Sequence, residues 1–251
     1  MRFTESFDLA FKNILGSKMR TFLTMLGIVI GVTAVIVIVG LGNGMQGYVE
    51  DSFSSMGTNS LTVSITGRGS SRKVSVDDMY QLVSDNPDLF SQISPTVSMS
   101  GTVKVGTDTL DSTSVTGVSE DYLTMKDYTL STGRGIGYVD ITARKNVCVV
   151  GHHISDTYYG GNAVGQSIKV GASKLIIVGV LNQITDTEEA GGSDDAIFLP
   201  YSTAARLTNT GNINSYTITV VDDSLATKGK TAVEDYLYSV FEDEDVYHAL
   251  P

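Results

Sequence analysis

A run of 29 residues without Asp, Glu, Lys or Arg separates Arg20 from Glu50. Residues 22–41 of this run are almost entirely apolar, and a helix of that length at about 1.5 Å per residue spans about 30 Å, the thickness of a bilayer's hydrocarbon core. We therefore predict one transmembrane helix over residues 18–45. A cleavable signal peptide is the alternative, but its apolar core is about 7–15 residues long and is followed by a small-residue cleavage site, which this sequence lacks.

Charge is distributed unevenly around the predicted transmembrane helix. Of the net charge of −11, the first 20 residues contribute +2 and the residues from Glu50 onward contribute −13. The positive-inside rule then predicts a single-pass protein of the cell membrane, with a cytoplasmic amino terminus, an extracytoplasmic carboxyl-terminal domain, and Lys18 and Arg20 as anchors at the membrane interface. Because the acidic part lacks clusters of Lys and Arg, we expect no nucleic-acid partner.

Two patterns indicate how the helix meets its surroundings. In residues 1–17 the apolar side chains recur at helical spacing, which predicts an amphipathic helix lying in the cytoplasmic interface. These side chains are Phe3, Phe7, Ala10, Phe11, Ile14 and Leu15. Gly27 and Gly31 form a G-x-x-x-G pair, which lets another helix approach closely in lipid. Glycine is also common in membrane helices without such a role, so packing at Gly27 and Gly31 is a hypothesis.

The sequence after residue 50 alternates between strand and helix patterns. Alternating apolar residues predict strands, and apolar residues at i, i+3 and i+4 predict helices. Ser75 and Asp78 form a capping box that predicts a helix start, and Asn86-Pro87 predicts its end. The predicted strands cover residues 61–65, 93–99, 146–150, 167–170, 175–181, 196–199, 216–220 and 246–250, and the other predicted helices cover 152–160, 202–207 and a segment ending near Glu242.

This order of elements predicts an α+β fold behind the transmembrane helix. One βαβ unit in residues 50–100 and a second in residues 213–251 would form a split, ferredoxin-like lobe. Residues 101–212 are short Val-, Ile- and Thr-rich runs punctuated by glycine, so we expect them to form a β-rich lobe inserted between the two halves. The result is a two-lobed extracytoplasmic domain.

Motifs with catalytic chemistry are few. The lone Cys148 lies in an apolar run, so we expect a buried strand residue rather than a reactive thiol. The pair His152-His153 lacks a spaced third metal ligand, so we expect it to have a helix-start or surface role. The carboxylates of residues 186–195 lack the spacing of a calcium loop, so we expect a solvated acidic loop there. The sequence contains no nucleotide-binding loop and no nucleophile elbow. We predict no catalytic residue, no metal site, no cofactor and no enzymatic activity.

Several segments resemble the MacB-type ABC transporter permeases. They begin with residues 10–15 and 18–36 and continue outside the membrane segment in the family's order. The later segments are Val118-Ser-Glu-Asp-Tyr-Leu123, Gly133-Arg134, Val147-Cys-Val-Val-Gly151, Val164-Gly-Gln-Ser-Ile168, Ile177-Val-Gly-Val-Leu181 and Phe198-Leu-Pro-Tyr-Ser-Thr203. Together they extend over nearly the whole chain.

The resemblance implies a porter-like lobe in residues 50–100 and 213–251 and a sabre-like lobe in residues 101–212. It implies a dimeric, non-catalytic permease subunit whose extracytoplasmic domain moves when a partner ATPase, which binds ATP and Mg, hydrolyses ATP. Such mechanotransmission would serve the efflux of peptides, antibiotics or other amphiphiles, or mechanical work on lipoproteins or cell-wall enzymes. A membrane-fusion adaptor protein is a further implied partner.

Two departures from the family pattern shape these expectations. Some relatives carry a fused ATPase domain, whereas this sequence begins at the interfacial helix, so we expect the ATPase on a separate chain. The family continues into three more helices where this sequence ends at Pro251, so we expect a truncated chain, with an incomplete reading frame as the alternative. The competing function is a stand-alone, membrane-anchored binding or sensor module without transport activity.

Overall fold

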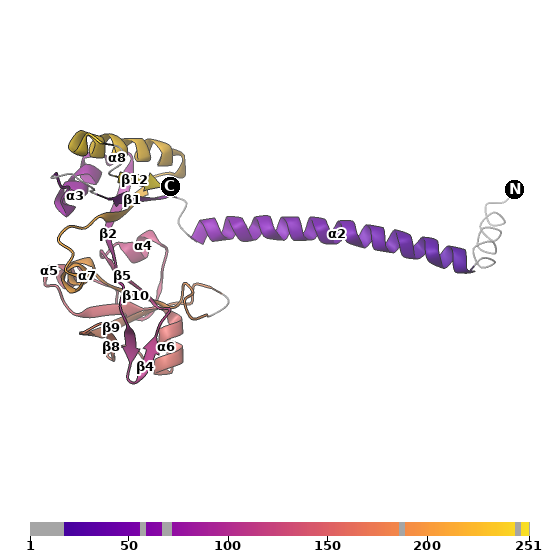
Figure 1. Ribbon diagram of the computed structural model, residues 1–251, viewed down its shortest axis with the longest axis horizontal. Helices are drawn as coiled ribbons and strands as arrows, with labels where there is room; N and C mark the ends of the chain where they lie inside the picture. The colour runs from indigo at the N-terminus through magenta and orange to yellow at the C-terminus, as the bar shows by residue number, and fades with distance from the viewer. Residues whose placement is uncertain (1–17, 56–58, 67–71, 186–188, 244–246, 251) are drawn as a thin grey trace. The chain divides into compact units, whose positions relative to one another are not determined.

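The computed structural model describes residues 18–55, 59–66, 72–185, 189–243 and 247–250 (Figure 1). The chain divides into two compact units, Met1–Ser54 and Ser55–Pro251, which we call the helical unit and the folded unit. The interfacial helix predicted for residues 1–17 lies outside the described residues.

The helical unit is described as a single helix, α2, over Lys18–Ser55. Its stretch Phe22–Gly40 is long and apolar enough to cross a membrane, and none of that stretch is buried. Ile38, for example, is 69% exposed. A core helix of a soluble domain would bury such side chains, so α2 is suited to an apolar solvent. The helix continues to Ser55, ten residues past the predicted transmembrane segment.

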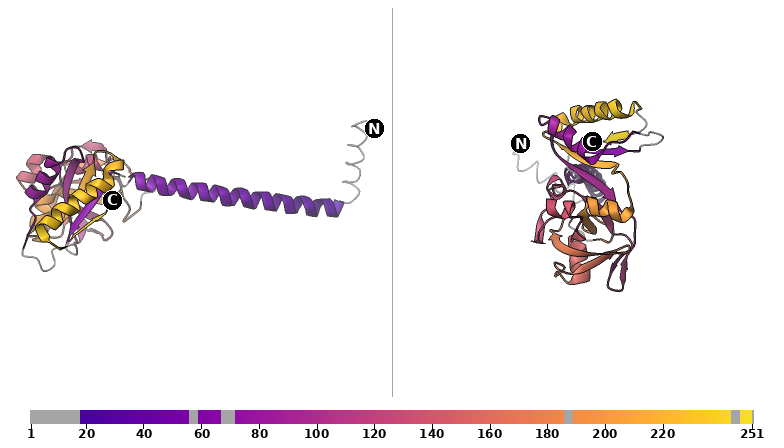
Figure 2. Two further views of the ribbon diagram at one scale, coloured as in Figure 1. Left: turned by 90° about the horizontal axis from the view of Figure 1, so that it is seen from above. Right: turned by 90° about the vertical axis from the view of Figure 1, so that its left-hand side faces the viewer.

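In the folded unit, the first and last strands of the sequence lie side by side (Figures 1 and 2). Four neighbouring strands run in the order β12-β1-β11-β2, each antiparallel to the next. They are β1 (Ser60–Ile65), β2 (Phe90–Ser98), β11 (Ser215–Val220) and β12 (Tyr247–Leu250). Strands β1 and β2 are therefore parallel with β11 between them, which is the split βαβ arrangement.

Two helices connect these strands. Helix α3 (Val76–Asp85) joins β1 to β2, and its capping box is formed because Ser75 Oγ accepts from Asp78 N at 3.1 Å while Asp78 Oδ2 accepts from Ser75 N at 2.8 Å. Helix α8 (Ala226–Phe241) joins β11 to β12 and contacts β1 and β12. A Cβ on Gly229 would lie 2.8 Å from Val220 Cγ1, so glycine permits α8 to approach the sheet.

Residues between β2 and β11 extend the same path of strands as β2-β5-β10-β7-β9-β8-β3-β4, with β6 on β9. The strands are β3 (Val103–Val105), β4 (Asp108–Leu110), β5 (Ser114–Val118), β6 (Leu130–Gly133), β7 (Val147–Val150), β8 (Ser167–Val170), β9 (Ser173–Leu181) and β10 (Ala196–Pro200). The helices are α4 (Tyr122–Met125), α5 (Tyr138–Thr142), α6 (His152–Tyr159) and α7 (Tyr201–Thr208), and a 3₁₀ turn, η1 (Asp223–Leu225), precedes α8.

Pairing in this second group of strands is mixed. Strand β10 is parallel to β5 and antiparallel to β7, and β7 is parallel to β9. Apolar side chains form two clusters. The larger includes Leu61, Ile177 and Leu237, and the smaller includes Leu123, Val149 and Phe198. Because Cys148 belongs to the larger cluster and its neighbour Val149 to the smaller, β7 is covered on both faces.

The α+β class with one apolar amino-terminal helix is confirmed. The strand and helix predictions that fall on described residues are also confirmed, and the predicted strand ends differ from the observed ones by at most three residues. Individual elements between residues 101 and 145 were not predicted. Strands β3, β4 and β6 have only three or four residues each, and β5, α4 and α5 have only four or five. The division into lobes stays a prediction, because the strands form one continuous path.

The predicted solvated loop at residues 186–195 is wrong for its last two carboxylates. Asp194 is fully buried and accepts from Ile184 N at 2.7 Å and from Thr185 N at 3.0 Å. Asp195 is 3% exposed and accepts from Thr113 Oγ1 at 2.6 Å and from Gly191 N at 2.8 Å. These carboxylates accept from backbone N–H groups of Ile184, Thr185 and Gly191 and from the Thr113 hydroxyl, a role that charge spacing alone does not distinguish from solvation. Glu189 is exposed as predicted.

Candidate functional site

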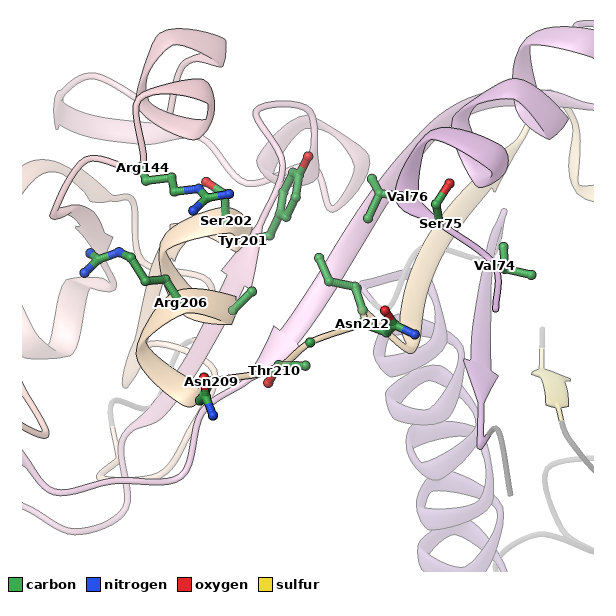
Figure 3. Close-up of a pocket in the computed structure, with 13 residues that line it drawn as sticks. Val74, Ser75, Val76, Arg144, Tyr201, Ser202, Arg206, Asn209, Thr210 and Asn212 are labelled. Carbon is green, nitrogen blue, oxygen red and sulfur yellow. The ribbon is translucent and has the colours of Figure 1, made fainter. Parts of the chain in front are cut away.

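Two adjoining cavities in the folded unit form a groove bordered by α3, α5 and α7. Their volumes are about 450 Å³ and about 500 Å³, and both are lined by Val76, Arg144, Tyr201 and Ser202. We call them the polar cavity and the aromatic cavity. Figure 3 shows the polar cavity, with α7 on one side and the residues that lead into α3 on the other. Cavities of this size suit a small ligand or a short peptide segment.

Close packing fixes α7 at one wall of the groove. A Cβ on Gly117 in β5 would overlap Ala204 of α7, so only glycine allows the helix this close to the strand. Thr203 is buried and its Oγ1 donates to Lys145 O at 2.9 Å. Ser202 Oγ donates to Ile141 O, which ties α7 to α5. The groove wall is therefore built from two helices joined by hydrogen bonds.

A buried carboxylate holds the end of α5. Asp140 is paired with Arg134 at 2.6 Å and with Lys145 at 3.1 Å, and it also accepts from Gly137 N at 3.0 Å. The Arg134 guanidinium, together with the Gly137 amide and Lys145, lowers the pKa of Asp140 to about 2. Because Asp140 is ionised and satisfied, α5 and the residues that follow it have a fixed position.

The dipeptide Gly133-Arg134 has a structural role beside this site. Gly133 has φ +81°, and a Cβ there would overlap Val178 O. Reciprocally, a Cβ on Gly179 would overlap the backbone oxygen of Arg134. Strands β6 and β9 thus approach each other through two glycines, and this approach places Arg134 beside Asp140. The motif supports the groove and does not line it.

Arg144 is the charged residue that both cavities share. It follows α5, whose carboxyl-terminal cap is Ala143, and has φ 48°, a left-handed conformation in which glycine is the usual residue. Within the described part of the chain, its guanidinium has no hydrogen bond and no ion pair. Arg206 also lines the polar cavity, but its Nη2 donates to Asn146 Oδ1 at 2.7 Å, and its guanidinium points away from Arg144 (Figure 3).

Aromatic side chains dominate the second cavity. Tyr80, Tyr138 and Tyr201 line it together with Ile141, and Tyr138 is 66% exposed. Burial raises the pKa of the Tyr80 and Tyr201 hydroxyls, so both rings stay neutral at physiological pH. Asp77 and Glu120 add two carboxylates to the lining of this cavity. The groove therefore offers a cation that both cavities share, and aromatic surface and acid groups in the second cavity.

The structure also places the other residues considered for chemistry. Cys148 is fully buried, and burial raises the pKa of its thiol. His152 begins α6, and the ring of His153 packs edge-on against Tyr158 with a centroid distance of 6.5 Å. Among the described residues, no group of three or more His, Cys, Asp or Glu side chains could hold a metal ion.

The residues predicted from the sequence to contact a membrane or a second helix lie in α2, far along the sequence from the groove. A Cβ added at Gly27 or Gly31 would meet no heavy atom within 4 Å among the described residues outside the helix's own backbone. Lys18 and Arg20 lie in the first turn of α2, and their side chains are outside the described part. Their roles in packing and anchoring stay predictions.

The sequence did not nominate the groove residues. Tyr201 and Ser202 occur in a segment already quoted for its family resemblance, which was their only signal. Arg144, Tyr80 and Tyr138 belong to no spacing pattern, because they come from elements that meet only through the sheet. Arg144 follows the end of α5, at a position where glycine is common. It can be recognised as unusual only once the helix boundary is known.

Comparison with known proteins assigns the fold to a family. Residues 21–236 match the family model of the MacB-like periplasmic core domain. The chain belongs to this family. Among curated relatives, it is 29% identical over 257 residues to the macrolide export ATP-binding/permease protein MacB of Acinetobacter baylyi, covering 98% of this chain and 38% of that protein. It is 28% identical to MacB of Neisseria gonorrhoeae, covering 98% and 39%. The chain thus spans less than two-fifths of the length of these MacB relatives.

Two solved structures share the MacB-like fold. The periplasmic region of MacB from Actinobacillus actinomycetemcomitans superposes with a TM-score of 0.63 at 20% identity, covering 79% of this chain and 91% of that one. The extracellular domain of the noncanonic ABC-type transporter YknZ from Gram-positive bacteria gives a TM-score of 0.62 at 12% identity, covering 77% and 100%. At these identities the likeness is one of fold.

Proposed function

We propose that this chain is part of the permease subunit of a MacB-like ABC transporter. In this proposal α2 crosses the cell membrane with its amino terminus in the cytoplasm, and the folded unit is extracytoplasmic. ATP hydrolysis by an ABC ATPase moves the folded unit, and the motion drives efflux of peptides, antibiotics or other amphiphiles. The observation that carries the proposal is the family match over residues 21–236, which includes the apolar helix and most of the folded unit.

The shape of α2 supports a mechanical role. Its 38 residues form one uninterrupted helix, of which Phe22–Gly40 is apolar enough to cross a membrane. At about 1.5 Å per residue, the 15 residues after Gly40 extend the helix by about 22 Å beyond the apolar stretch. A continuous helix transmits displacement and rotation along its axis better than a jointed one.

The partners follow from the same proposal. ATP and Mg bind to the ATPase, and this chain supplies no catalytic group. A second permease protomer packs against the helix face that contains Gly27 and Gly31, because small residues at this spacing allow close helix contact. A membrane-fusion adaptor is a further partner of the folded unit.

A purification in the native organism tests this function. The gene is tagged at its chromosomal locus, the product is extracted in mild detergent, and the eluate is assayed for ATP hydrolysis. We expect an ABC ATPase to elute in comparable amount, and we expect a strain lacking the gene to become more susceptible to macrolides or antimicrobial peptides. The membrane-anchored binding module makes the opposite prediction, in which the tagged protein elutes without an ATPase and the deletion leaves susceptibility unchanged.

A further inference from the structure

The polar and aromatic cavities together have a distribution of charge that selects a ligand. Arg144 lies in the wall that the two cavities share and has no ion-pair partner within the described chain. The other charged residue of the polar cavity is Arg206, and that cavity has no carboxylate in its lining. In a protein with a net charge of −11, a carboxylate-free cavity with an unpaired arginine is complementary to an anion.

The backbone of Arg144 is strained and firmly held. A residue other than glycine is disfavoured in the left-handed region, because its Cβ crowds the backbone there. The backbone on both sides is fixed, because Lys145 O accepts from Thr203 Oγ1 and Asp140 O accepts from Lys145 N at 2.9 Å. Arg144 therefore presents its guanidinium from a rigid support, and a planar guanidinium pairs well with a carboxylate.

Uncharged groups in the polar cavity suit a peptide backbone. Asn209 and Asn212 line this cavity, and within the described residues neither side-chain amide has a hydrogen-bond partner. Figure 3 shows both at the end of α7 and in the segment that follows it. A primary amide both donates and accepts, so each can pair with a peptide N–H or carbonyl.

The aromatic cavity supplies the complementary features. Tyr80, Tyr138 and Ile141 offer apolar surface for one large side chain. Asp77 and Glu120 in the lining of that cavity favour a basic residue nearby. The acid groups of the aromatic cavity and the arginine at the shared wall would orient a bound peptide, with its basic residues near the acid groups and its carboxylate at the arginine.

We propose that this groove binds the carboxyl terminus of an extended peptide. Arg144 pairs with the terminal carboxylate, Asn209 and Asn212 bind the backbone, and the aromatic cavity takes an apolar side chain, with basic residues preferred next to it. The inference rests on the proposed function, because it gives the substrate class of peptides a site on the extracytoplasmic side.

Calorimetric titration of the full chain in detergent micelles tests the proposal. The probes are the acetylated tetrapeptide Ala-Lys-Ala-Phe with a free carboxylate and the same peptide as its carboxamide. We expect the acid to bind at least about tenfold more tightly than the amide, because a charge-assisted pair is lost in the amide. In Arg144→Gln the two peptides should bind equally weakly, and Arg144→Lys should restore part of the difference.

Arg206→Gln is the matched control. It removes an arginine from the same cavity lining whose guanidinium is already held by Asn146, so the preference for the acid should persist. Unchanged melting temperatures in both glutamine variants show that the fold is intact. Equal binding of acid and amide to the wild type, no binding of either, or equal losses in the two glutamine variants would overturn the proposal.

Inorganic phosphate is the remaining probe. Phosphate binding that depends on Arg144, without any binding of the peptide, would overturn peptide recognition in favour of a simple anion site. These titrations fail or succeed independently of the ATPase co-purification. Loss of the peptide site would leave a permease with a different substrate class, whereas loss of the ATPase partner would remove the transporter itself.

Discussion

Helices α2 and α8 contain many apolar residues and place them in opposite ways. In α2 the large apolar side chains from Phe22 to Val39 point in every direction and are exposed, with Val35 at 61%. In α8 the buried residues Gly229, Val233, Leu237 and Phe241 recur every four residues on one side of the helix. An all-round apolar surface is stable in lipid, whereas a one-sided apolar stripe is stable between a core and water.

The two units are therefore stable in different surroundings. The folded unit gains its stability by removing apolar side chains from water and by pairing the polar groups that it buries. The helical unit buries none of its apolar stretch against the described chain, so the surrounding lipid must supply the apolar environment. Equivalent substitutions in the two units should therefore have different consequences.

The largest effect is expected from placing a carboxylate in each helix. Leu237→Asp puts a charge into the core, where Leu237 is fully buried, and should destabilise the folded unit by at least about 4 kcal/mol. Val35→Asp should leave the melting temperature of the folded unit unchanged but cost about 2.5–3.5 kcal/mol of membrane insertion. Circular dichroism melts and membrane fractionation measure the two outcomes. Equal loss of fold in both variants would refute the claim that the two units are stable in different surroundings.

Glycine substitution should also distinguish the units. Gly133→Ala adds a Cβ that overlaps Val178 O at a φ of +81°, so we expect a loss of at least about 2 kcal/mol in unfolding free energy. Gly27→Ala adds a Cβ with open space around it and should not destabilise the folded unit. Denaturant melts of both variants provide the test. A tolerated Gly133→Ala would show that β6 and β9 can separate at little cost.

The internal ion pair of the folded unit should give a smaller effect. Asp140→Asn leaves Arg134 and Lys145 without their buried partner and should cost about 1–3 kcal/mol, discounted because both cations are half exposed. Since the pKa of Asp140 is lowered from 3.8 to about 2, its contribution is fully present above pH 4 and is lost as pH falls through 2. Acid melts should show this loss in the wild type and not in Asp140→Asn.

The smallest effect concerns helix capping. Helix α3 begins with a capping box at Ser75 and has Asp77 and Asp78 in its first turn, whereas α2 has no acidic residue in its first turn. Ser75→Ala should destabilise the folded unit by about 1 kcal/mol, because the backbone N–H of Asp78 loses the Ser75 hydroxyl as its acceptor. A urea titration can resolve this change. No shift in its midpoint would mean that packing, rather than the cap, determines where α3 begins.

Periodicity predicted the regular parts of the fold, because burial on one face leaves a repeat in the sequence. The pattern at Leu61, Val63 and Ile65 predicted β1, and all three side chains are buried. The capping box at Ser75 predicted the start of α3, because its two residues are only three positions apart in the sequence. Strands of three or four residues such as β3 and β4 are too short to show a repeat.

Long-range pairing explains what the sequence did not predict. Asp194 and Asp195 looked like exposed charges, but their partners include Thr113, 82 residues from Asp195. Arg144 and Tyr80 border the same cavity through separate elements, so no spacing connects them. Polar side chains that pair with residues far along the sequence, and pockets built from several elements, depend on tertiary structure that a local pattern does not contain.

Labelling in intact cells tests most directly the claim that α2 holds the folded unit outside the membrane. Thr107 lies exposed between β3 and β4, so Thr107→Cys offers one accessible thiol, while the fully buried Cys148 keeps the parent chain unreactive until it is denatured. We expect a membrane-impermeant maleimide to label Thr107→Cys equally before and after permeabilisation. Labelling only after permeabilisation would place the folded unit in the cytoplasm and contradict the account.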